Sequence, residues 1–377
     1  MKLHNAFAVV GCALALSGCC SFFGDSYPEK IDEGFVPLAD ESAMWAKIAS
    51  GENIVLRYDF LTTAPFGGEG VLPALADNNG KQIWGKDKNY AGNGSYVRKD
   101  GMWNFSEVKL IGGKLEVYIN GYLVTTADKV TAHTKWIGYQ GKEQYRNIRV
   151  KTLPECAKLG GCPCQHLQCP DGFTAYYNGD PEQLKTMWKG VTTEGKFDNP
   201  FVRQAATKEE RELMQIIADK GRDDHWHIRN GVLYFDGFKG GYSLATKQDY
   251  GDFEMWADWR IMSITGDSGL YLRGNPQVQI WDAHNQWHIG SGGLFNNRKN
   301  PSKALVIADN LVGDWNRFHV IMRGDRVTVW LNGQLVVDDV TLENYWDRSK
   351  PIFPIEQIEL QCHGDPTEWR NVFIKAL

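Results

Sequence analysis

The sequence lacks a membrane-spanning apolar segment, an excess of basic residues and, over most of its length, a helical pattern. Its longest apolar run, residues 6–16, is shorter than the ~20 residues that a transmembrane helix needs. Lys and Arg total 41 against 46 Asp and Glu, so the formal charge is −5. This balance argues against a nucleic-acid partner, because such proteins carry a basic face. Helical spacing occurs only at residues 208–220, through Leu213, Ile216 and Ile217.

Glycine and tryptophan are abundant instead. The 377 residues include 40 glycines and 14 tryptophans. Glycine at this level without a three-residue period indicates many tight turns, which favours an all-β chain over a collagen-like one. Apolar or alternating segments typical of strands occur at residues 55–60, 232–235, 253–259 and 318–322. Short strands between glycine turns, in a chain long enough for two or three domains, predict β-sandwiches.

An internal repeat divides the chain. Three dipeptides recur in the same order, Trp-Asn, Asn-Gly and Arg-Asn, at residues 103, 120 and 146 and again at residues 315, 332 and 370. The spacing from Trp-Asn to Asn-Gly is 17 residues in both copies. Asn-Gly between alternating apolar residues is a strong hairpin signal, so each copy is expected to end in the same strand–turn–strand plan. The repeat predicts two tandem β-sandwiches, over residues 33–152 and 171–377.

The N-terminus has the pattern of an export signal. Lys2 precedes the apolar run, which ends in Leu16-Ser17-Gly18-Cys19. This ending resembles the signal box of bacterial lipoproteins, which implies that residues 1–18 are removed, that Cys19 carries the lipid and that residues 19–32 form a tether. Cys at position 20, where Asp would favour the inner membrane, implies anchoring at the outer membrane. An ordinary cleaved signal with incidental cysteines is the alternative.

Four cysteines are clustered between the two copies. Residues 153–170 contain Cys156, Cys162, Cys164 and Cys169. Disulfides persist in exported proteins, so the cluster predicts a linker stapled by two disulfides whose pairing the sequence leaves open. His166 lies among the cysteines and makes zinc the alternative, although the spacing does not match the C-x₂₋₄-C pairs of zinc ribbons.

The second copy carries a series of ordered motifs. They occur at residues 226–233, 244–246, 250–254, 268–274, 277–282, 361–364 and 369–371. Together they resemble the 3-keto-disaccharide hydrolase domain family, whose fold is a concanavalin-like jelly roll. Gln277 stands where many members carry Glu, so the resemblance supports no catalytic carboxylate there. The first copy keeps only the skeleton of these motifs and is interpreted as a diverged, non-catalytic sandwich that binds glycans or serves as a platform.

Strand parity locates a candidate site. Side chains alternate across a strand, so residues of one parity share a face. Four strands of the second copy each have an apolar face and a polar face, the polar ones carrying Glu254, Trp256, Asp258 and Arg260; Tyr271 and Arg273; Gln277, Gln279 and Trp281; and Glu359, Gln361 and His363. This mixture suits stacking on sugar rings and hydrogen bonding to hydroxyls. An ordinary solvated face is the alternative.

Asp282 and His284 follow the end of one of these strands and are expected at the rim of the face. The sequence requires no cofactor. His284 and His288, four residues apart, leave a divalent metal as an alternative, although the surrounding glycines favour a loop.

The resemblance implies a substrate, an oligosaccharide or glycoside oxidised at C3. A ketone at C3 acidifies the C2 proton, so a base can start an elimination that expels the anomeric substituent, and water can add afterwards. On this hypothesis Arg273 stabilises the enolate, His363 is base or acid, and Asp282 or Glu254 is the complementary carboxylate. The expected substrate-binding residues are Tyr271, Gln277, Gln279, Trp281, His284, Trp256 and Gln361. Alternatively, Arg273 pairs with Glu254 or Asp258, and His363 holds its turn.

Two other functions compete with this one. A surface lipoprotein that binds carbohydrate without catalysis fits the same face, since a fold does not fix an activity. A laminarinase-type glucanase would need closely spaced carboxylates on one strand. Glu254 and Asp258 are four residues apart with Trp256 between them, which does not fit that pattern.

Overall fold

The computed structural model describes residues 31, 33–37, 45–47, 53–61, 74–76, 82–84, 96–98, 101–128, 136–138, 144–153, 167–284 and 288–377. Below, the C-terminal sandwich means residues 167–377 and the N-terminal region means the described part of residues 33–153. The predicted signal, Cys19, and Cys156, Cys162 and Cys164 of the predicted disulfides lie outside the described residues. Cys169 is described as a thiol whose Sγ is 3.3 Å from the Phe173 carbonyl oxygen.

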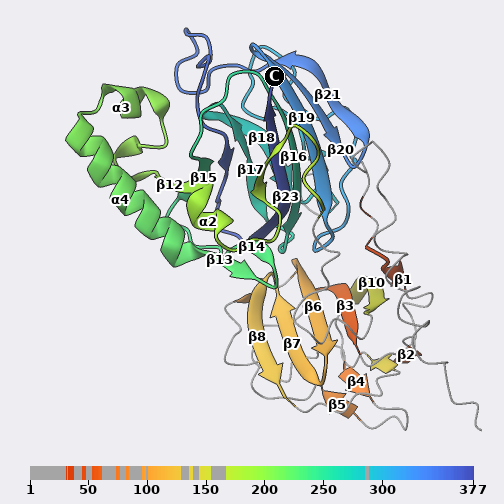
Figure 1. Ribbon diagram of the computed structural model, residues 1–377. Helices are drawn as coiled ribbons and strands as arrows, with labels where there is room; N and C mark the ends of the chain where they lie inside the picture. The colour runs from red at the N-terminus through yellow and green to blue at the C-terminus, as the bar shows by residue number, and fades with distance from the viewer. Residues whose placement is uncertain are drawn as a thin grey trace, which may run out of the picture.

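One layer of the C-terminal sandwich is an eight-stranded antiparallel sheet (Figure 1). Its strand order is β13-β14-β23-β16-β19-β20-β21, with β11 paired to β23. The strands are β11 (Thr174–Tyr177), β13 (Trp226–Arg229), β14 (Val232–Phe235), β16 (Phe253–Ile261), β19 (Asn316–Arg323), β20 (Arg326–Leu331), β21 (Gln334–Thr341) and β23 (Thr367–Ala376).

The other layer is a five-stranded antiparallel sheet of order β12-β15-β22-β17-β18. Its strands are β12 (Trp188–Thr192), β15 (Tyr242–Thr246), β17 (Asp267–Leu272), β18 (Asn275–Trp281) and β22 (Glu359–Leu360). The apolar residues of both sheets form one buried cluster, which includes Leu270, Val278 and Leu360 from this sheet and Met255 and Val320 from the other. The polar side of the five-stranded sheet therefore faces away from the core.

Among the described residues, the helices of the C-terminal sandwich flank the five-stranded sheet. They are α2 (Gln183–Thr186), the 3₁₀ turn η4 (Glu194–Lys196), α3 (Pro200–Ala205) and α4 (Lys208–His225). The predicted helix at 208–220 is confirmed as α4, which starts with a capping box between Thr207 and Glu210. Its expected apolar face is wrong, because Leu213 and Ile216 are exposed and the buried residues are Ala218, Gly221 and Arg222. The helix packs closely on β12 at Ala218, because a Cβ on Gly190 of β12 would meet the Ala218 backbone.

The N-terminal region consists of a six-stranded and a four-stranded antiparallel sheet. The six-stranded sheet has the order β1-β10-β3-β6-β7-β8, formed by β1 (Val36–Pro37), β3 (Ile54–Leu61), β6 (Trp103–Ile111), β7 (Lys114–Ile119), β8 (Tyr122–Ala127) and β10 (Gln144–Thr152). The four-stranded sheet has the order β2-β9-β4-β5, formed by β2 (Trp45–Lys47), β4 (Ala74–Ala76), β5 (Gln82–Trp84) and β9 (Trp136–Gly138). The chain is therefore all-β, as predicted.

The six-stranded sheet repeats the path of the eight-stranded one. The run β10-β3-β6-β7-β8 has the same order of strands along the chain as β23-β16-β19-β20-β21. The repeated dipeptides make matching contacts. Asn120 and Asn332 each adopt a positive φ, accept a backbone N–H across the hairpin and donate to the Asn of the preceding Trp-Asn pair.

The Arg-Asn pairs of the repeat match as well. Asn147 donates to Asp59 over 2.7 Å, and Asn371 donates to Asp258 over 2.8 Å. The guanidinium before each Asn lies over the tryptophan of its own copy, 3.9 Å from the ring centre in the N-terminal region and 4.1 Å in the C-terminal sandwich. The repeated residues are thus structural in both copies. That the N-terminal region is a diverged copy of the second sandwich stays a hypothesis.

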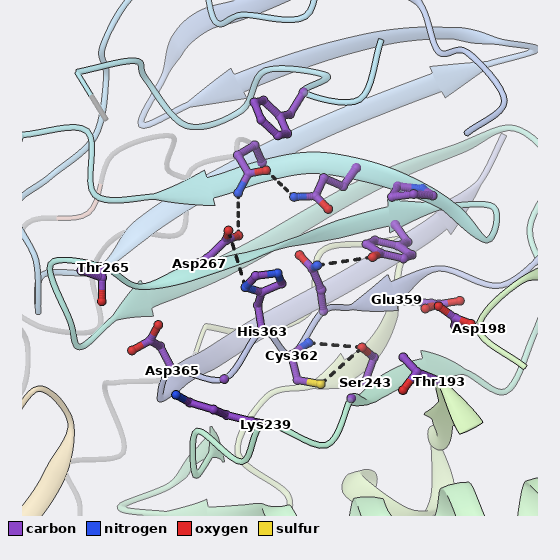
Figure 2. Close-up of a pocket in the computed structure, with 18 of the residues that line it drawn as sticks. Thr193, Asp198, Lys239, Ser243, Thr265, Asp267, Glu359, Cys362, His363 and Asp365 are labelled. Atoms are coloured by element: carbon purple, nitrogen blue, oxygen red, sulfur yellow. Dashed lines mark hydrogen bonds and ion pairs between the residues drawn. The ribbon is translucent and has the colours of Figure 1, made fainter. Parts of the chain in front are cut away.

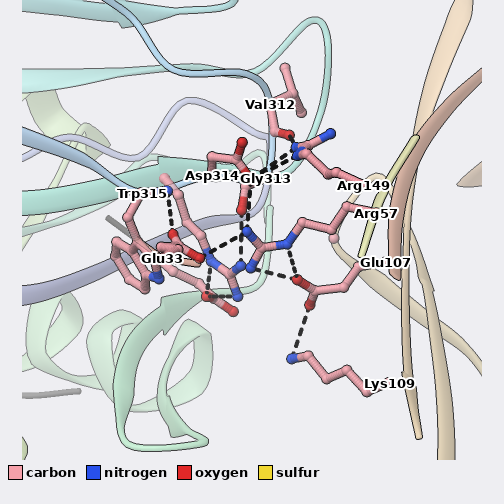
Figure 3. A network of polar contacts seen from close by, with 12 residues as sticks. Glu33, Arg57, Glu107, Lys109, Arg149, Val312, Gly313, Asp314 and Trp315 are labelled. Carbon is pink, nitrogen blue, oxygen red and sulfur yellow. Dashed lines mark hydrogen bonds and ion pairs between the residues drawn. The ribbon is translucent and has the colours of Figure 1, made fainter. Parts of the chain in front are cut away.

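A buried ionic cluster joins the two units (Figure 3). Arg57 of β3 contacts Glu33 at 3.0 Å, Glu107 at 2.7 Å and, across the interface, Asp314 at 2.8 Å. Arg260 of the C-terminal sandwich forms a second ion pair across the interface, with Glu107 at 3.1 Å. Burial disfavours the charged Glu107, but Lys109, Arg260 and Arg57 outweigh it and hold its pKa well below the usual range. The Phe105 side chain also belongs to the core of the C-terminal sandwich, so the interface is partly apolar.

Within the described residues, no helix combines the length and the apolar character needed to cross a membrane.

Candidate active site

A large pocket lies over the polar side of the five-stranded sheet (Figure 2). Its volume is about 1380 Å³. The floor is formed by residues of β12, β15, β17, β18 and the β22 segment. Loops around Asp198, Lys239, Phe295 and Tyr345 form the walls. These walls explain why polar residues on an outer face, such as Gln279 and Glu359, are each only 1% exposed.

Strand register brings the floor residues together in pairs. Tyr271 of β17 lies opposite Glu359 of β22. Two residues along, the Gln361 N–H donates to the Gly269 carbonyl. Opposite residues on neighbouring strands have side chains on the same face, about 5 Å apart. Gly269 leaves the middle of the floor open, because a Cβ there would lie 2.8 Å from the Val278 carbonyl oxygen and 3.1 Å from Gln361 Oε1.

Glu359 is a buried carboxyl group in this floor. Gln357 donates to its Oε1 over 2.7 Å. Burial raises the pKa of Glu359 to about 7, partly offset by Arg203 and Gln357 and assisted by Glu356 and Asp198. Burial likewise raises the pKa of Asp198, which Figure 2 shows beside Glu359. A carboxyl group with this pKa can take up or release a proton near neutral pH.

Tyr271 keeps its phenol proton next to Glu359. Burial, with the Glu359 and Asp198 carboxylates, raises the pKa of Tyr271 well above its usual value. Its oxygen accepts a hydrogen bond from Gln361 Nε2 over 3.3 Å, which leaves the phenol O–H to donate elsewhere. Tyr271 can therefore act as a neutral hydrogen-bond donor in the pocket.

A histidine–carboxylate pair lies at the other end of the floor. His363 Nδ1 is 3.6 Å from Asp267 Oδ2, and 57% of the His363 side chain is exposed. Burial raises the pKa of Asp267, and the nearby His363 partly offsets this. Gln279 also donates to Asp267 over 2.8 Å. Asp267 is thus held in place behind an imidazole that reaches the open pocket.

Amide side chains line the pocket floor. Gln277 Nε2 donates to Gln279 Oε1, and Gln279 donates onward to Asp267. Gln361 Oε1 is buried without a hydrogen-bond partner among the described residues. Buried acceptors of this kind need a donor, and a sugar hydroxyl or a water can supply one.

Five predicted site residues line the pocket: Tyr271, Gln277, Gln279, Gln361 and His363. Strand parity placed them correctly on one face, because β17, β18 and the β22 segment belong to one sheet.

The alternation of residues 253–260 is confirmed, because Phe253, Met255, Ala257 and Trp259 lie in the core. Placing their polar partners on the same face as the other three strands was wrong, since β16 belongs to the eight-stranded sheet. Glu254 pairs with His319 at 2.9 Å, and the Trp256 ring stacks on His319 at 4.0 Å. Neither residue lines the pocket. Alternation tells which residues of a strand share a face but not which sheet the strand joins.

The remaining predicted residues also lie outside the pocket lining. Arg273 is 2% exposed and donates to the carbonyls of Pro354 and Gly324, so it pairs with neither Glu254 nor Asp258. Asp282 is buried beyond the end of β18 and accepts the His284 N–H.

The Trp281 indole donates to the Ile289 carbonyl and packs edge-to-face against Phe295, and of these two rings only Phe295 lines the pocket. The imidazole of His284 contacts the Asp309 carbonyl. Within the described part of the chain, no group of three or more His, Cys, Asp or Glu residues is arranged to hold a metal ion.

Some lining residues received no role from sequence reasoning. Glu359 was placed on the polar face without a role in the site, and Asp267, which shares strand parity with Tyr271, was not named. Asp198, Lys239 and Tyr345 come from loops, whose folding over the sheet no periodicity reveals.

A family model for the 3-keto-alpha-glucoside-1,2-lyase-like domain matches residues 173–375, more than half of the chain. The chain belongs to this family. The matched residues, called the lyase-like domain below, include Asp198, Asp267, Tyr271, Glu359 and His363. The predicted resemblance is therefore confirmed for the C-terminal sandwich. The comparison also supports a carbohydrate-active, glycoside-directed role.

Solved structures similar to the chain include two candidate glycosyl hydrolases from Parabacteroides distasonis. One is 23% identical, with a TM-score of 0.34, and covers 41% of this chain and 91% of its own. The other is 19% identical, with a TM-score of 0.38, and covers 55% of this chain and 94% of its own. A carbohydrate-binding module, CBM66, from Bacillus subtilis is 16% identical, with a TM-score of 0.26, and covers 40% and 91%. No curated protein matches the chain.

Proposed function

We propose that the lyase-like domain cleaves glycosides oxidised at C3 by elimination across C1 and C2. The observation that carries this proposal is the placement of two proton-transfer groups at opposite ends of one open floor. Glu359, with a pKa of about 7, lies opposite Tyr271, and His363 lies against Asp267. Asp267 and Tyr271 are four residues apart on β17, which spans about 13 Å in a strand. This separation leaves room for a sugar ring over the floor between the two groups.

Glu359 is the base in this scheme. As a carboxylate it takes the C2 proton, and the electron pair of the C2–H bond moves into a C2–C3 double bond with the negative charge on the C3 oxygen. A base whose pKa lies near the operating pH combines basicity with availability. Tyr271, which retains its proton beside Glu359, donates a hydrogen bond to the enolate oxygen.

His363 is the acid. The enolate re-forms the C3 ketone, C1–C2 becomes a double bond, and the bond from C1 to the leaving oxygen breaks. The imidazolium gives its proton to that oxygen, and Asp267 stabilises the charged form that precedes the transfer. The products are an enone sugar and a free alcohol, and addition of water to the enone completes a net hydrolysis.

This assignment changes two roles expected from the sequence. Arg273 is replaced by Tyr271 as the enolate stabiliser, because the Arg273 guanidinium is occupied by backbone carbonyls outside the pocket. Glu359 replaces Asp282 and Glu254 as the carboxylate, because neither of those lines the pocket.

The test is turnover of a panel of α- and β-linked 3-keto-glycosides with aryl leaving groups, with and without chelator. We expect wild-type protein to release the aryl alcohol and an absorbing enone, and to slow when C2 carries deuterium. Glu359→Gln and His363→Asn should each lower kcat by 10²-fold or more, the typical contribution of a positioned acid or base.

Glu254→Gln is the matched control, since Glu254 pairs with a histidine, His319, on the opposite sheet. It should retain wild-type kcat. Near-wild-type kcat in Glu359→Gln, or a loss confined to Glu254→Gln, would contradict the assignment. Binding of the substrates by wild-type protein without any product would favour the non-catalytic carbohydrate-binding alternative.

A further inference from the structure

The pocket is closed on one side by the N-terminal region. Six residues outside the lyase-like domain line it: Tyr96, Val97, Arg98, Met102, Asn120 and Tyr122. We call them the N-terminal wall. They come from the turn after β7, the start of β8 and the loop before β6.

The N-terminal wall is fixed in place on both sides. Asn120 donates to the Tyr96 carbonyl over 2.7 Å, which ties the loop to the β7–β8 turn. That turn is packed closely on the C-terminal sandwich, because a Cβ on Gly121 would lie 2.6 Å from Met262 and 2.7 Å from Pro366. Arg98 reaches across to Asp365 at 3.1 Å and to Ser263. The wall is therefore built into the pocket and is not a loose neighbour.

Two tyrosines give this wall a flat aromatic surface. The rings of Tyr96 and Tyr122 stack with centres 4.3 Å apart and planes 13° apart. Both side chains are half-buried and line the cavity. Burial, with Asp365 nearby, raises the pKa of Tyr122 to about 12, so its hydroxyl stays neutral. Stacked tyrosine rings suit the apolar face of a sugar ring, and the neutral hydroxyl of Tyr122 suits its hydroxyl edge.

The N-terminal wall lies at the His363 end of the floor. Asp365 connects them, since it pairs with Arg98, its charge raises the pKa of Tyr122, and nearby His363 partly offsets the effect of burial on the pKa of Asp365 itself. In the proposed reaction His363 protonates the leaving oxygen, so the leaving group points toward this wall. The cavity of about 1380 Å³ exceeds the 300–1,000 Å³ typical of small-ligand pockets, which leaves room for a second ring.

We infer that the N-terminal wall forms a subsite for the leaving group of the substrate, and that this leaving group carries a second sugar ring. This inference rests on the proposed function, since it uses the direction of the elimination. It makes the N-terminal region part of substrate recognition and makes 3-keto-disaccharides better substrates than 3-keto-glycosides of small alcohols.

The test compares Tyr122→Ala and Tyr96→Ala with wild-type protein on a 3-keto-disaccharide and on a methyl 3-keto-glycoside. We expect kcat/KM for the disaccharide to fall roughly 10-fold or more, the loss of about one stacking contact, with little change for the methyl glycoside. Leu123→Ala is the control, because Leu123 is the next residue of β8 and is 46% exposed. It should leave both substrates unaffected.

Equal losses on both substrates would overturn the subsite, since they would mean a structural role, and so would unchanged kinetics on the disaccharide. Tyr122→Leu, which keeps apolar bulk, serves as a second variant if Tyr122→Ala misfolds. Calorimetric titration with an unoxidised disaccharide and its monosaccharide tests the subsite without turnover. Wild-type protein should bind the disaccharide more tightly, and Tyr122→Leu should remove most of that difference. If wild-type protein turned over none of the substrates but still bound the disaccharide more tightly than the monosaccharide, the proposed reaction would be rejected and the subsite retained.

Discussion

At the scale of single residues, burial of Glu359 destabilises the folded protein and also suits the carboxyl group to proton transfer. Glu359 is 1% exposed, and the only hydrogen bond to its carboxylate among those described comes from Gln357. A paired structural carboxylate behaves differently: Arg260, Arg229 and Lys109 outweigh the effect of burial on Glu368 and lower its pKa to about 2. Both residues are equally buried, so the cations decide the direction. A buried carboxyl whose nearby cations do not outweigh its burial is typical of a group used for proton transfer.

The raised pKa of Glu359 predicts a pH-dependent cost to stability. In the unfolded chain the carboxyl ionises near 4.5, whereas in the folded chain it ionises near 7, so the folded state is penalised as the pH rises between these values. Glu359→Gln should therefore stabilise the protein at pH 8 relative to wild type, by up to about 3 kcal/mol, and much less at pH 4.5.

Denaturant unfolding at both pH values measures this effect. Glu254→Gln is again the control and should show no such gain at pH 8. An equal effect of Glu359→Gln at pH 4.5 and pH 8 would mean that Glu359 does not ionise in this range.

At the scale of single elements, the two asparagine turns are hairpins with matching side-chain contacts. Asn332 accepts the Arg317 N–H and donates to the Ala308 carbonyl over 2.9 Å, at φ 50°. Asn332→Ala loses these bonds and places a Cβ-bearing residue without a compensating side chain in the left-handed region. We expect it to lower the free energy of unfolding by about 2–4 kcal/mol.

Asn332→Gly separates the two contributions, because glycine tolerates the backbone but makes no side-chain bonds. It should recover about 1 kcal/mol of the loss in chemical denaturation. Gln334→Ala, two residues on and exposed, should be close to neutral. If Asn332→Gly were no better than Asn332→Ala, the backbone contribution would be excluded.

The sequence reveals these hairpins because their signals are local. Asn-Gly sets the turn, and alternation sets the faces of β17, β18 and the β22 segment, so part of the floor could be predicted. The membership of β16 in the other sheet could not, since pairing partners far apart in sequence decide it. The same holds for Asp198 and Lys239, whose loops fold over the floor, and for Tyr122, whose position depends on how two units dock.

At the scale of the whole molecule, the ionic cluster makes the two units depend on each other. Arg57 contributes the cation between Glu33, Glu107 and Asp314, with only 5% of its side chain exposed. Arg57→Met removes it and leaves buried carboxylates with less compensation. We expect a loss of about 3–5 kcal/mol in the free energy of unfolding, as for other broken buried pairs.

Arg326→Met provides the matched control, because Arg326 pairs with Asp339 on the surface, where the side chains are 47% and 63% exposed. Chemical denaturation should give a change below about 1 kcal/mol for this variant. Comparable losses in the two variants would show that the buried position of Arg57 carries no special weight.

The shared pocket wall links occupancy to assembly. An occupant that touches both the lyase-like domain and the N-terminal wall binds only when the two units are docked. By mass action it then works as a reversible cross-link, worth about 2.7 kcal/mol at a ligand concentration 100 times Kd. A bound occupant therefore stabilises the docked arrangement of the two units, and its release lowers the free energy needed to separate them.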